Sequence, residues 1–452
     1  MTGLEPAQCR PLLRDIFAAA IEATNGAALL RRGGNVEGSH WHYGDKRQHF
    51  EFPLPAGAAD GKLVVVGAGK AAASLAAGLE ASLGSRIDDG CIIVKYGHAL
   101  PLSRIRVIEG GHPEPDQAGA LGTQEILSMV RNLSSRDSAF VVLTGGASAL
   151  MVAPAPGLTL DDKTEVNRLL IRSGASINDI NVVRKHLSVV KGGGLLAAAN
   201  GARLCTLAIS DVIGDNLSTI GSGPTVADPS TFQDALDVLS AHGLLQQIPA
   251  RALARLHSGV RGLVAETLKP GSALAARNWP LIVANLAQAL SAMSAHARAL
   301  GFSVEVRNEP MSGDTHAAAR SVAEWIRSSL RGKAASAPPL VLIAGGETTL
   351  QVHGPGRGGR NQEFALIMAS ELQGLPEVTV LSAGTDGTDG PTDVAGAFTD
   401  GSTLERARAS GLDYGSILAL NDSYTLFDVL GDHFRSGPTG TNVMDVCVAI
   451  VG

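Results

Sequence analysis

The feature that most constrains this chain is a repeated pattern in which a short run of β-branched residues ends in a small-residue turn and a helical pattern follows. Alternation of short strands with helices is typical of parallel βαβ units, and we therefore predict an α/β fold. The predicted strands fall into two series, which indicates two α/β domains. The first series occupies residues 62–67, 91–95, 139–146 and 204–210, and the second occupies residues 281–285, 302–306, 340–346 and 378–384.

A segment with weak periodicity separates the two series. Residues from about 249 to 280 contain several glycines and prolines, which is typical of a domain junction. We therefore predict an N-terminal domain over residues 1–265 and a C-terminal domain over residues 266–452. Near the start of the chain, apolar residues from Leu12 to Ile21 have helical spacing, and we expect that helix to pack on a sheet.

Charge and cysteine content argue against several functional classes. The net charge of -6 provides no diffuse basic field, so nucleic acid and anionic membranes are not expected partners. The four cysteines are far apart and form no CxxC pair, which fits neither a cysteine-rich zinc site nor a disulfide framework. Charged residues interrupt the N-terminal segment, and no segment reaches membrane-spanning length, so we expect a cytoplasmic protein.

The glycine turns after the strands are the first candidate binding positions, because ligands of open α/β sheets bind at the carboxyl ends of the strands. Glycine lets a phosphate approach backbone N–H groups, and a following helix N-terminus favours an anion. In GAGKAA, Lys70 adds a compact charge that suits a phosphate or a carboxylate, with a solvated surface lysine as the alternative. In TGGASAL, Gly145, Gly146 and Ser148 offer donors for the polyphosphate of a nucleotide cofactor or for a small carboxylate, with a plain tight turn as the alternative.

A further glycine-rich segment lies within residues 181–199. The pattern predicts a helix that continues to Lys191, crosses Gly192 and Gly193, and then resumes as an apolar helix. We predict that Lys191 and these glycines contact a phosphate group of a nucleotide.

Two groups of aspartates are candidate magnesium ligands, because magnesium is typically bound by one or two carboxylates together with substrate phosphates. Asp211 follows a predicted strand, whereas the nearby Asp215 is more typical of a turn. Asp386 follows another buried strand, in the segment SAGTDGTDGPTD. We predict Asp211 and Asp386 as catalytic or metal-binding residues, with a structural turn network as the alternative for Asp386.

Arg360 is the clearest candidate in the second series of strands. The segment HGPGRGGRNQEF places it at the end of a glycine loop, directly before an amphipathic helix. Cations stabilise the C-terminal end of a helix rather than its N-terminus, so this placement favours a guanidinium that binds an anion. Arg357, in the same loop, is a weaker candidate.

The histidines provide no clear catalytic motif. Neither an HExxH pair nor a GxSxG serine is present, so hydrolase chemistry lacks its usual signature. His40, His42 and His49 could form a metal cluster, but the polar composition of residues 35–61 favours an exposed hairpin or loop. His112 could contact a substrate, although a structural role is the favoured interpretation.

Six segments, in their order along the chain, closely resemble the glycerate 2-kinase family, whose C-terminal part is called the MOFRL domain. The resemblance covers essentially the whole chain and is far more specific than a single glycine loop. The segments are GGASALMVAPAPGLTLDDK, NVVRKHLSVVKGGGL, SDVIGDNLSTIGSGPT, GRGGRNQE, SAGTDGTDGPTDVAGA and GPTGTNVMD.

The resemblance implies that ATP, with Mg2+, phosphorylates D-glycerate to 2-phosphoglycerate. It also implies a cleft between a larger, Rossmann-like N-terminal domain and a smaller C-terminal domain. By their motifs, Lys70 and Arg360 resemble the charged catalytic pair of the family. The sequence departs from the family pattern at Ala147, where a third glycine is expected, and at Thr348, where proline is expected.

Two other functions fit part of the sequence. A nicotinamide-dependent hydroxypyruvate reductase would suit the Rossmann-like domain, but the dinucleotide fingerprint lacks its third glycine, and the second strand ends at Lys95 rather than at an acidic residue. A sugar-phosphate-binding module would use the same glycine loops and cations. The sequence leaves the oligomeric state open, with a homo-oligomer as one alternative.

Overall fold

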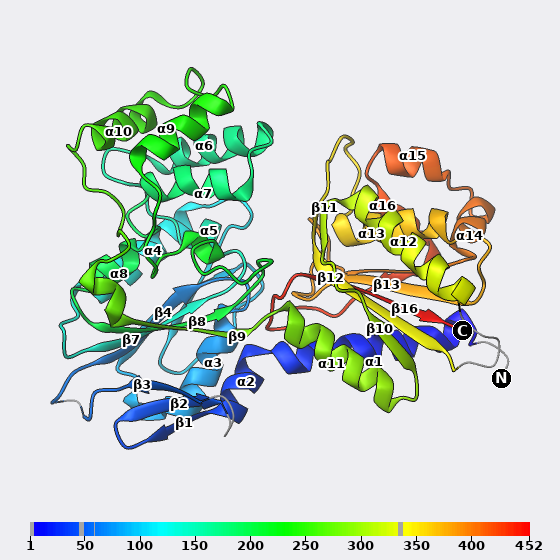
Figure 1. Cartoon of the computed structure of the whole chain (residues 1–452), viewed down its shortest axis with the longest axis horizontal. Coiled ribbons are helices and arrows are strands. Elements are labelled where there is room, and N and C mark those ends of the chain that lie inside the picture. Colours follow the sequence, from blue (N-terminus) through cyan, green and yellow to red (C-terminus); the bar gives the residue numbers. More distant parts are fainter. Residues whose placement is uncertain (1–3, 45–48, 58, 333–337) are drawn as a thin grey trace. The chain divides into compact units, whose positions relative to one another are not determined.

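The computed structural model of the chain describes residues 4–44, 49–57, 59–332 and 338–452. Within these residues the chain forms two compact units. The central unit comprises Gly26–Val283, and the terminal unit combines Met1–Asn25 with Ala284–Gly452 (Figure 1).

The main sheet of the central unit has six strands in the order β6-β5-β4-β7-β8-β9. The five strands from β4 to β8 pair in parallel, as the alternation of strands and helices predicted. Both faces of β4 and β7 are buried, which explains why these strands are continuously apolar. The strands are β4 (Leu63–Ala68), β5 (Asp89–Lys95), β6 (Arg106–Gly110), β7 (Ser138–Leu143), β8 (Arg203–Ile209) and β9 (Asn278–Ala284).

Different layers cover the two faces of this sheet. On one face, α4 and α8 pack against side chains that include Val64, Val66 and Val141. On the other face, α3 packs on the sheet, and Trp41 of a small antiparallel sheet contacts Phe140, with ring centroids 5.1 Å apart. These elements are α2 (Gly26–Gly33), α3 (Ala72–Leu83), α4 (Gln117–Arg131), α8 (Gly194–Ala198), β1 (Gly34–Glu37), β2 (His40–Gly44) and β3 (His49–Pro53).

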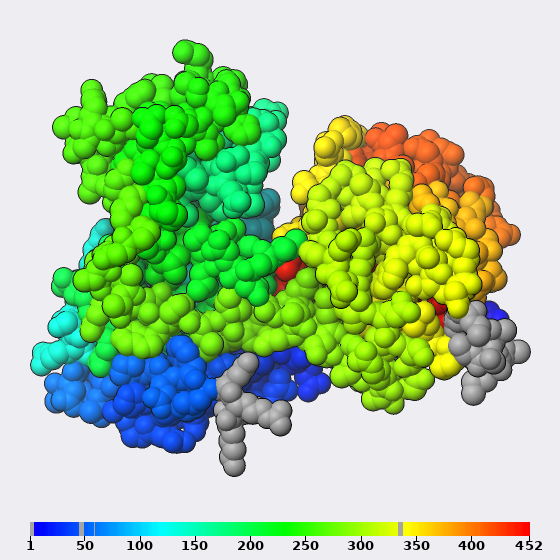
Figure 2. Space-filling view, in the orientation of Figure 1, coloured from blue at the N-terminus to red at the C-terminus, as the bar shows by residue number. Residues whose placement is uncertain are grey.

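Four further helices of the central unit form an apolar cluster of their own. The helices α9 and α10 lie at the top of this unit in Figure 1, where the space-filling view in the same orientation shows green atoms (Figure 2). Thr159 and Thr231 cap α6 and α9 in capping boxes, which explains where these two helices begin. The helices are α6 (Leu160–Arg172), α7 (Ile177–His186), α9 (Phe232–Ala241) and α10 (Ala250–Val260).

The sheet of the terminal unit is mixed rather than parallel. Its main path is β10-β12-β16-β13-β14-β15, and β11 also pairs with β12. β12 and β13 both pair antiparallel with β16, so the last strand of the chain lies between them. The strands are β10 (Ser303–Val306), β11 (Met311–Asp314), β12 (Leu340–Thr349), β13 (Val378–Gly384), β14 (Gly396–Asp400), β15 (His433–Phe434) and β16 (Asp445–Val451).

Helices cover this second sheet as well. α12 and α13 share an apolar core with β12, β13 and β16. The first helix of the chain, α1, packs on β13, β16 and α11, so the prediction that it packs on a sheet is confirmed. The helices are α1 (Pro6–Thr24), α11 (Leu286–Ala299), α12 (Thr315–Gly332), α13 (Arg360–Glu371), α14 (Thr403–Ala409), α15 (Tyr414–Ala419) and α16 (Ser423–Leu430). None of the described helices combines the length and the hydropathy of a membrane span.

The strand at 281–285, predicted for the second series, belongs to the first sheet. It forms part of β9, at the edge of the six-stranded sheet. The units therefore divide at Val283, whereas the sequence placed the division at residue 265. The apolar pattern of β9 suits either sheet, because periodicity identifies a strand but not its neighbours. For the same reason, the sequence did not associate α1 with the C-terminal strands.

The helix predicted to reach Lys191 ends earlier, at His186. The chain then turns, and Ser188 forms an isolated bridge with Pro154. Gly192 and Gly193 adopt positive φ values of 56° and 78°, which a continuous helix does not allow. The helix resumes only at α8. Lys191 therefore lies in a turn, not on a helix.

Gly259 of α10 provides a test of the helical cluster, because a Cβ atom there would overlap the ring of Phe232. Overpacking in Gly259→Ala should lower stability by about 1–3 kcal/mol, against a gain of about 1 kcal/mol from the helix propensity of alanine. We expect a lower melting temperature in thermal unfolding. Gly332→Ala in α12 is the control, because a Cβ there meets nothing within 4 Å. A Gly259→Ala protein as stable as this control would contradict the packing.

Candidate functional site

Lys70 lies in the turn between β4 and α3, just before the helix begins at Ala72. Its backbone N–H donates a 2.8 Å hydrogen bond to the carbonyl oxygen of Gly145. Gly69 before it has a φ of 138°, and a side chain there would overlap the hydroxyl of Thr144. The GAGK turn is therefore held directly against the TGGAS turn that follows β7.

His112 lies beside the same pair of turns. A Cβ atom on Gly146 would lie 3.0 Å from Cδ2 of His112 and 3.3 Å from Cγ of Lys70. The imidazole and the lysine side chain thus both line Gly146, which is partly exposed. The sequence favoured a structural role for His112, and its place next to Lys70 makes it a candidate for contact with a substrate.

The predicted nucleotide-binding residues Ser148 and Lys191 lie in contact. Nζ of Lys191 donates a 2.8 Å hydrogen bond to the backbone carbonyl oxygen of Ser148. The Ser148 hydroxyl lies 2.8 Å from the Ser222 hydroxyl, which donates to Oδ1 of Asn181 at 2.8 Å. These polar groups come from four segments of the central unit. Asn181 and Ser222 were not singled out from the sequence, although both lie inside motifs that resemble the family.

Two buried lysines give this region its electrostatic character. Burial lowers the pKa of Lys191 well below its ordinary value, and the charges of Lys163 and Arg184 lower it further. Burial, with a contribution from Arg184 and Arg255, lowers the pKa of Lys163 to about 7. Lys163 donates to the carbonyl oxygen of Leu187 at 3.2 Å. An anion bound nearby would stabilise the charged form of both lysines.

The backbone N–H groups of Gly192 and Gly193 already have acceptors within the protein. They donate to the carbonyl oxygens of Ser222 and Gly223 at 3.0 and 2.7 Å. A Cβ atom on Gly193 would also lie 2.5 Å from Cβ of Leu268. These glycines allow two loops to pack closely, and their predicted contact with a phosphate stays a prediction.

Asp211 lies just beyond the carboxyl end of β8 and is partly exposed. β8 pairs in parallel with β7, so Asp211 is at the same edge of the sheet as the TGGAS turn. Asp215 has a φ of 57°, and its N–H donates to the carbonyl oxygen of Val212 at 3.0 Å. Its conformation agrees with the turn role weighed for it from the sequence.

In the terminal unit, Arg360 is the first residue of α13, and its guanidinium binds carboxylates of the protein itself. Nε and Nη2 contact the two carboxylate oxygens of Asp445 at 2.5 and 3.1 Å, and Nη1 lies 2.7 Å from Oε1 of Glu347. Burial lowers the pKa of Arg360, but Asp445 and Glu347 raise it to a net value above the ordinary one. The guanidinium therefore has carboxylate partners within the protein, and its predicted contact with a substrate anion stays a prediction. The sequence did not identify either partner.

Asp386 lies close to this pair at the carboxyl end of β13. A Cβ atom on Gly384 would lie 3.3 Å from Oδ1 of Asp386 and 3.4 Å from Oδ1 of Asp445. The Asp386 side chain is buried, and Oδ1 accepts hydrogen bonds from the N–H and the hydroxyl of Thr388 at 2.9 and 3.2 Å. Arg360, Asp386 and Asp445 therefore form one charged group, with Asp386 partly engaged in its own turn.

Asp389, in the same loop, caps the helix that carries Arg360. Its two carboxylate oxygens accept hydrogen bonds from the N–H groups of Asn361 and Gln362, both at 2.9 Å. Burial and the charge of Asp445 nevertheless raise its pKa to about 6, against the effect of these hydrogen bonds. Arg357, by contrast, is exposed, and its guanidinium lies 4.3 Å from the centre of the Tyr424 ring.

Comparison with known proteins gives a consistent result over both units. A family model described as a domain of unknown function (DUF4147) matches residues 12–257, and the MOFRL family model matches residues 340–445. A glycerate 2-kinase of Pyrococcus horikoshii is 38% identical over 396 residues, which cover 86% of this chain and 88% of the relative. An Agrobacterium vitis relative, 40% identical over 87% of this chain and 88% of its own length, is named, provisionally, a hydroxypyruvate reductase.

One solved structure is similar to this chain along the whole length of both. The crystal structure of a glycerate kinase from Thermotoga maritima has a TM-score of 0.80 and 33% sequence identity to this chain. The match covers 99% of this chain and 100% of that one. The two-domain α/β fold predicted from the sequence is thus confirmed.

The buried Lys163 predicts a pH dependence of stability. Between a folded pKa of about 7 and its ordinary value of 10.5, the unfolded chain binds a proton that the folded protein does not. The contribution of Lys163 to stability should therefore rise with pH across this interval, and Lys163→Met should remove that contribution. Melting temperatures of both proteins across the interval test this. The melting temperature of the variant minus that of the wild type should decrease as the pH increases.

The variant also loses the hydrogen bond to Leu187, which changes its stability by the same amount at every pH. The test is therefore how the stability difference between the two proteins varies with pH. Lys62→Met, at an exposed lysine before β4, controls for removal of one positive charge. A difference between Lys163→Met and the wild type that does not change with pH would refute the assignment.

Proposed function

This chain belongs to the glycerate kinase family, and from that premise we propose that it transfers the γ-phosphoryl group of ATP to the 2-hydroxyl of D-glycerate. The products are ADP and 2-phosphoglycerate, and the hydroxyl proton passes to a base. The observation that carries the proposal is the hydrogen bond from the backbone of Lys70 to Gly145 of the TGGAS turn, in a chain similar along its whole length to a glycerate kinase.

Phosphoryl transfer asks a protein chiefly for positioning and for neutralisation of charge. Lys70, at the joined turns of β4 and β7, supplies an ammonium group next to glycine backbone. Arg360 supplies a guanidinium held in one orientation by Asp445 and Glu347. We assign both cations to stabilisation of the charge that develops on the transferred group. His112, which lines Gly146 with Lys70, is proposed to contact a substrate.

Magnesium fits the carboxylates of the candidate site unequally. A bound Mg2+ usually keeps several waters and offsets the negative charge of the nucleotide phosphates. Asp211 is partly exposed at the end of β8 and could hold a hydrated ion. Asp386 is 5% exposed and accepts two hydrogen bonds from Thr388. We therefore favour Asp211 as the metal ligand and Asp386 as the base.

A hydroxypyruvate reductase is the second candidate, because one relative bears that name. Against it, β5 ends at Lys95, where a dinucleotide-binding fold commonly has an acidic residue for the ribose. A nicotinamide dinucleotide and a nucleoside triphosphate are both anionic, so the lysines of the central unit do not distinguish the two functions. The two functions consequently need a direct assay.

Incubation of the purified protein with D-glycerate, ATP and Mg2+ should produce ADP and 2-phosphoglycerate. Phosphorus NMR identifies the product, because the 2-phosphate and 3-phosphate isomers give different signals. A parallel reaction with hydroxypyruvate and NADH should show no oxidation of NADH. Oxidation of NADH without ADP formation would favour the reductase, and a 3-phosphate product would exclude the proposed regiochemistry.

Lys70→Ala should lower kcat by at least about a hundredfold, because it removes charge stabilisation from the transition state. Its melting temperature should be close to that of the wild type, since Lys70 is partly exposed. Lys62→Ala, just before the other end of β4, is the matched control and should keep full turnover. Full turnover in Lys70→Ala would remove this residue from the mechanism.

Arg360→Ala needs a different control, because it also leaves the buried carboxylate of Asp445 without its partner. That loss should cost about 1–3 kcal/mol of stability in addition to the loss of turnover. Arg360→Ala combined with Asp445→Asn should recover much of the stability but not the turnover. If both recovered, Arg360 would serve only to balance the buried charge of Asp445.

A further inference from the structure

The small three-stranded sheet of the central unit has two chemically different faces. Along β2 and β3, the alternate residues Trp41 and Phe52 are fully buried and point to the core. Their rings lie 5.1 Å from Phe140 and, for Phe52, 5.6 Å from Trp279. Side chains of a strand alternate between the two faces of its sheet. The sequence neighbours of Trp41 on β2 and of Phe52 on β3 therefore point away from this core.

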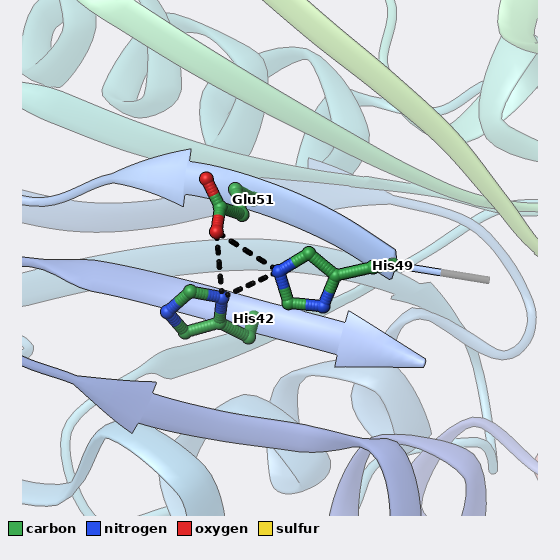
Figure 3. Close-up of side chains that lie close together, drawn as sticks. All are labelled: His42, His49 and Glu51. Atoms are coloured by element: carbon green, nitrogen blue, oxygen red, sulfur yellow. Dashed lines mark hydrogen bonds and ion pairs between the residues drawn. The ribbon is translucent and has the colours of Figure 1, made fainter. Parts of the chain in front are cut away.

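The outward face carries His42, His49 and Glu51. His42 and Glu51 are directly paired in the antiparallel register of β2 and β3. His49 precedes Glu51 by two residues on β3, so its side chain is on the same side of the sheet. Figure 3 shows all three side chains turned toward one point above the two strands. Residues 45–48, which belong to the hairpin predicted from the sequence, lie outside the described residues.

The ligand atoms of these residues are separated by distances that suit a common metal ion. Nδ1 of His42 lies 3.1 Å from Nε2 of His49, Oε1 of Glu51 lies 2.9 Å from Nε2 of His49, and it lies 3.4 Å from Nδ1 of His42. A circle through three such atoms has a radius of about 1.8 Å, slightly less than a zinc–nitrogen bond. A point at bonding distance from all three atoms therefore exists just above their plane.

Contacts to Oε1 of Glu51, which can accept from both imidazoles, account for two of the three short distances but not for the one between His42 and His49. A neutral imidazole nitrogen offers either one hydrogen or one lone pair in the ring plane. Nε2 of His49 nevertheless has both Nδ1 of His42 and Oε1 of Glu51 at hydrogen-bond distance. One in-plane hydrogen or lone pair serves one of these neighbours well, whereas a single cation would bind all three atoms at once.

We propose that His42 Nδ1, His49 Nε2 and Glu51 Oε1 form a zinc site that joins β2 to β3. Two imidazoles and one carboxylate are a ligand set that zinc accepts, whereas magnesium prefers oxygen ligands alone. The side chains of His49 and Glu51 are 55% and 54% exposed, so solvent reaches the site and a fourth position is open to water. His42, 13% exposed, anchors it.

This site is separate from the proposed phosphoryl transfer. Its ligands lie on β2 and β3, not on the turns that follow β4, β7 and β8. These two strands are exposed at the surface of the unit, within the blue atoms of the space-filling view (Figure 2). Zinc should stabilise the pairing of β2 with β3 without serving as the metal of the nucleotide.

Zinc titration of tag-free, chelator-treated protein against a chromogenic zinc indicator tests the proposal. We expect one zinc per chain, with a dissociation constant in the micromolar range or tighter. His42→Ala and His49→Ala should each weaken binding by at least about tenfold. Glu51→Gln should also weaken it, and because Glu51 is exposed this variant should fold even if a histidine variant did not.

His40→Ala is the matched control. His40 is two residues before His42 on the same face of β2, but its ring lies 6.2 Å from that of His42 and outside the cluster. The His40→Ala protein should bind zinc with the affinity of the wild type. Cobalt, used as a spectroscopic probe, should give the intense visible bands of a four-coordinate site in the wild type and in His40→Ala only.

Three results would overturn the proposal: no zinc bound at micromolar concentrations, equal affinity in the wild type and the His42→Ala, His49→Ala double variant, or loss of binding in His40→Ala alone. Glycerate phosphorylation with Mg2+ is measured on the same samples after chelation. Because it does not involve these ligands, its presence or absence leaves the zinc result unaffected.

Discussion

The central unit depends on the close contact between the ends of β4 and β7. Gly67 and Gly69 have positive φ values, and a side chain at either would overlap β7 or the hydroxyl of Thr144. The two strands stay side by side up to their last residues because these positions lack a Cβ atom. This contact sets the turn of Lys70 against the TGGAS turn, and the proposed binding of an anion by this unit rests on that juxtaposition.

A charged contact has the corresponding role in the terminal unit. Arg360 begins α13, and Asp445 begins β16, the strand inserted between β12 and β13. The two-point contact between them fixes the guanidinium in one orientation, and Glu347 of β12 binds its third nitrogen. A guanidinium held in this way would need little reorganisation in the proposed stabilisation of a developing charge.

Sequence reasoning was most accurate where a local pattern has one physical meaning. The buried runs of β4, β5, β7 and β8 lie where the alternation predicted them, and the turns after β4 and β7 are joined. It was least accurate where the pattern has several meanings. The apolar run of β9 suits either sheet, and Lys191 followed a helical pattern although it lies in a buried turn. Neither ambiguity could be resolved without the neighbouring strands and loops.

By itself, the sequence determined that the chain forms two α/β units with glycine turns at the strand ends, because periodicity and glycine act over a few neighbouring residues. Its family motifs also indicated the candidate site residues. Only the tertiary structure decided what those residues contact: Asp445 for Arg360, His112 and Gly146 for Lys70, and one another for His42, His49 and Glu51. Strand order and register bring these groups together, and both arise from packing between segments that are distant in the chain.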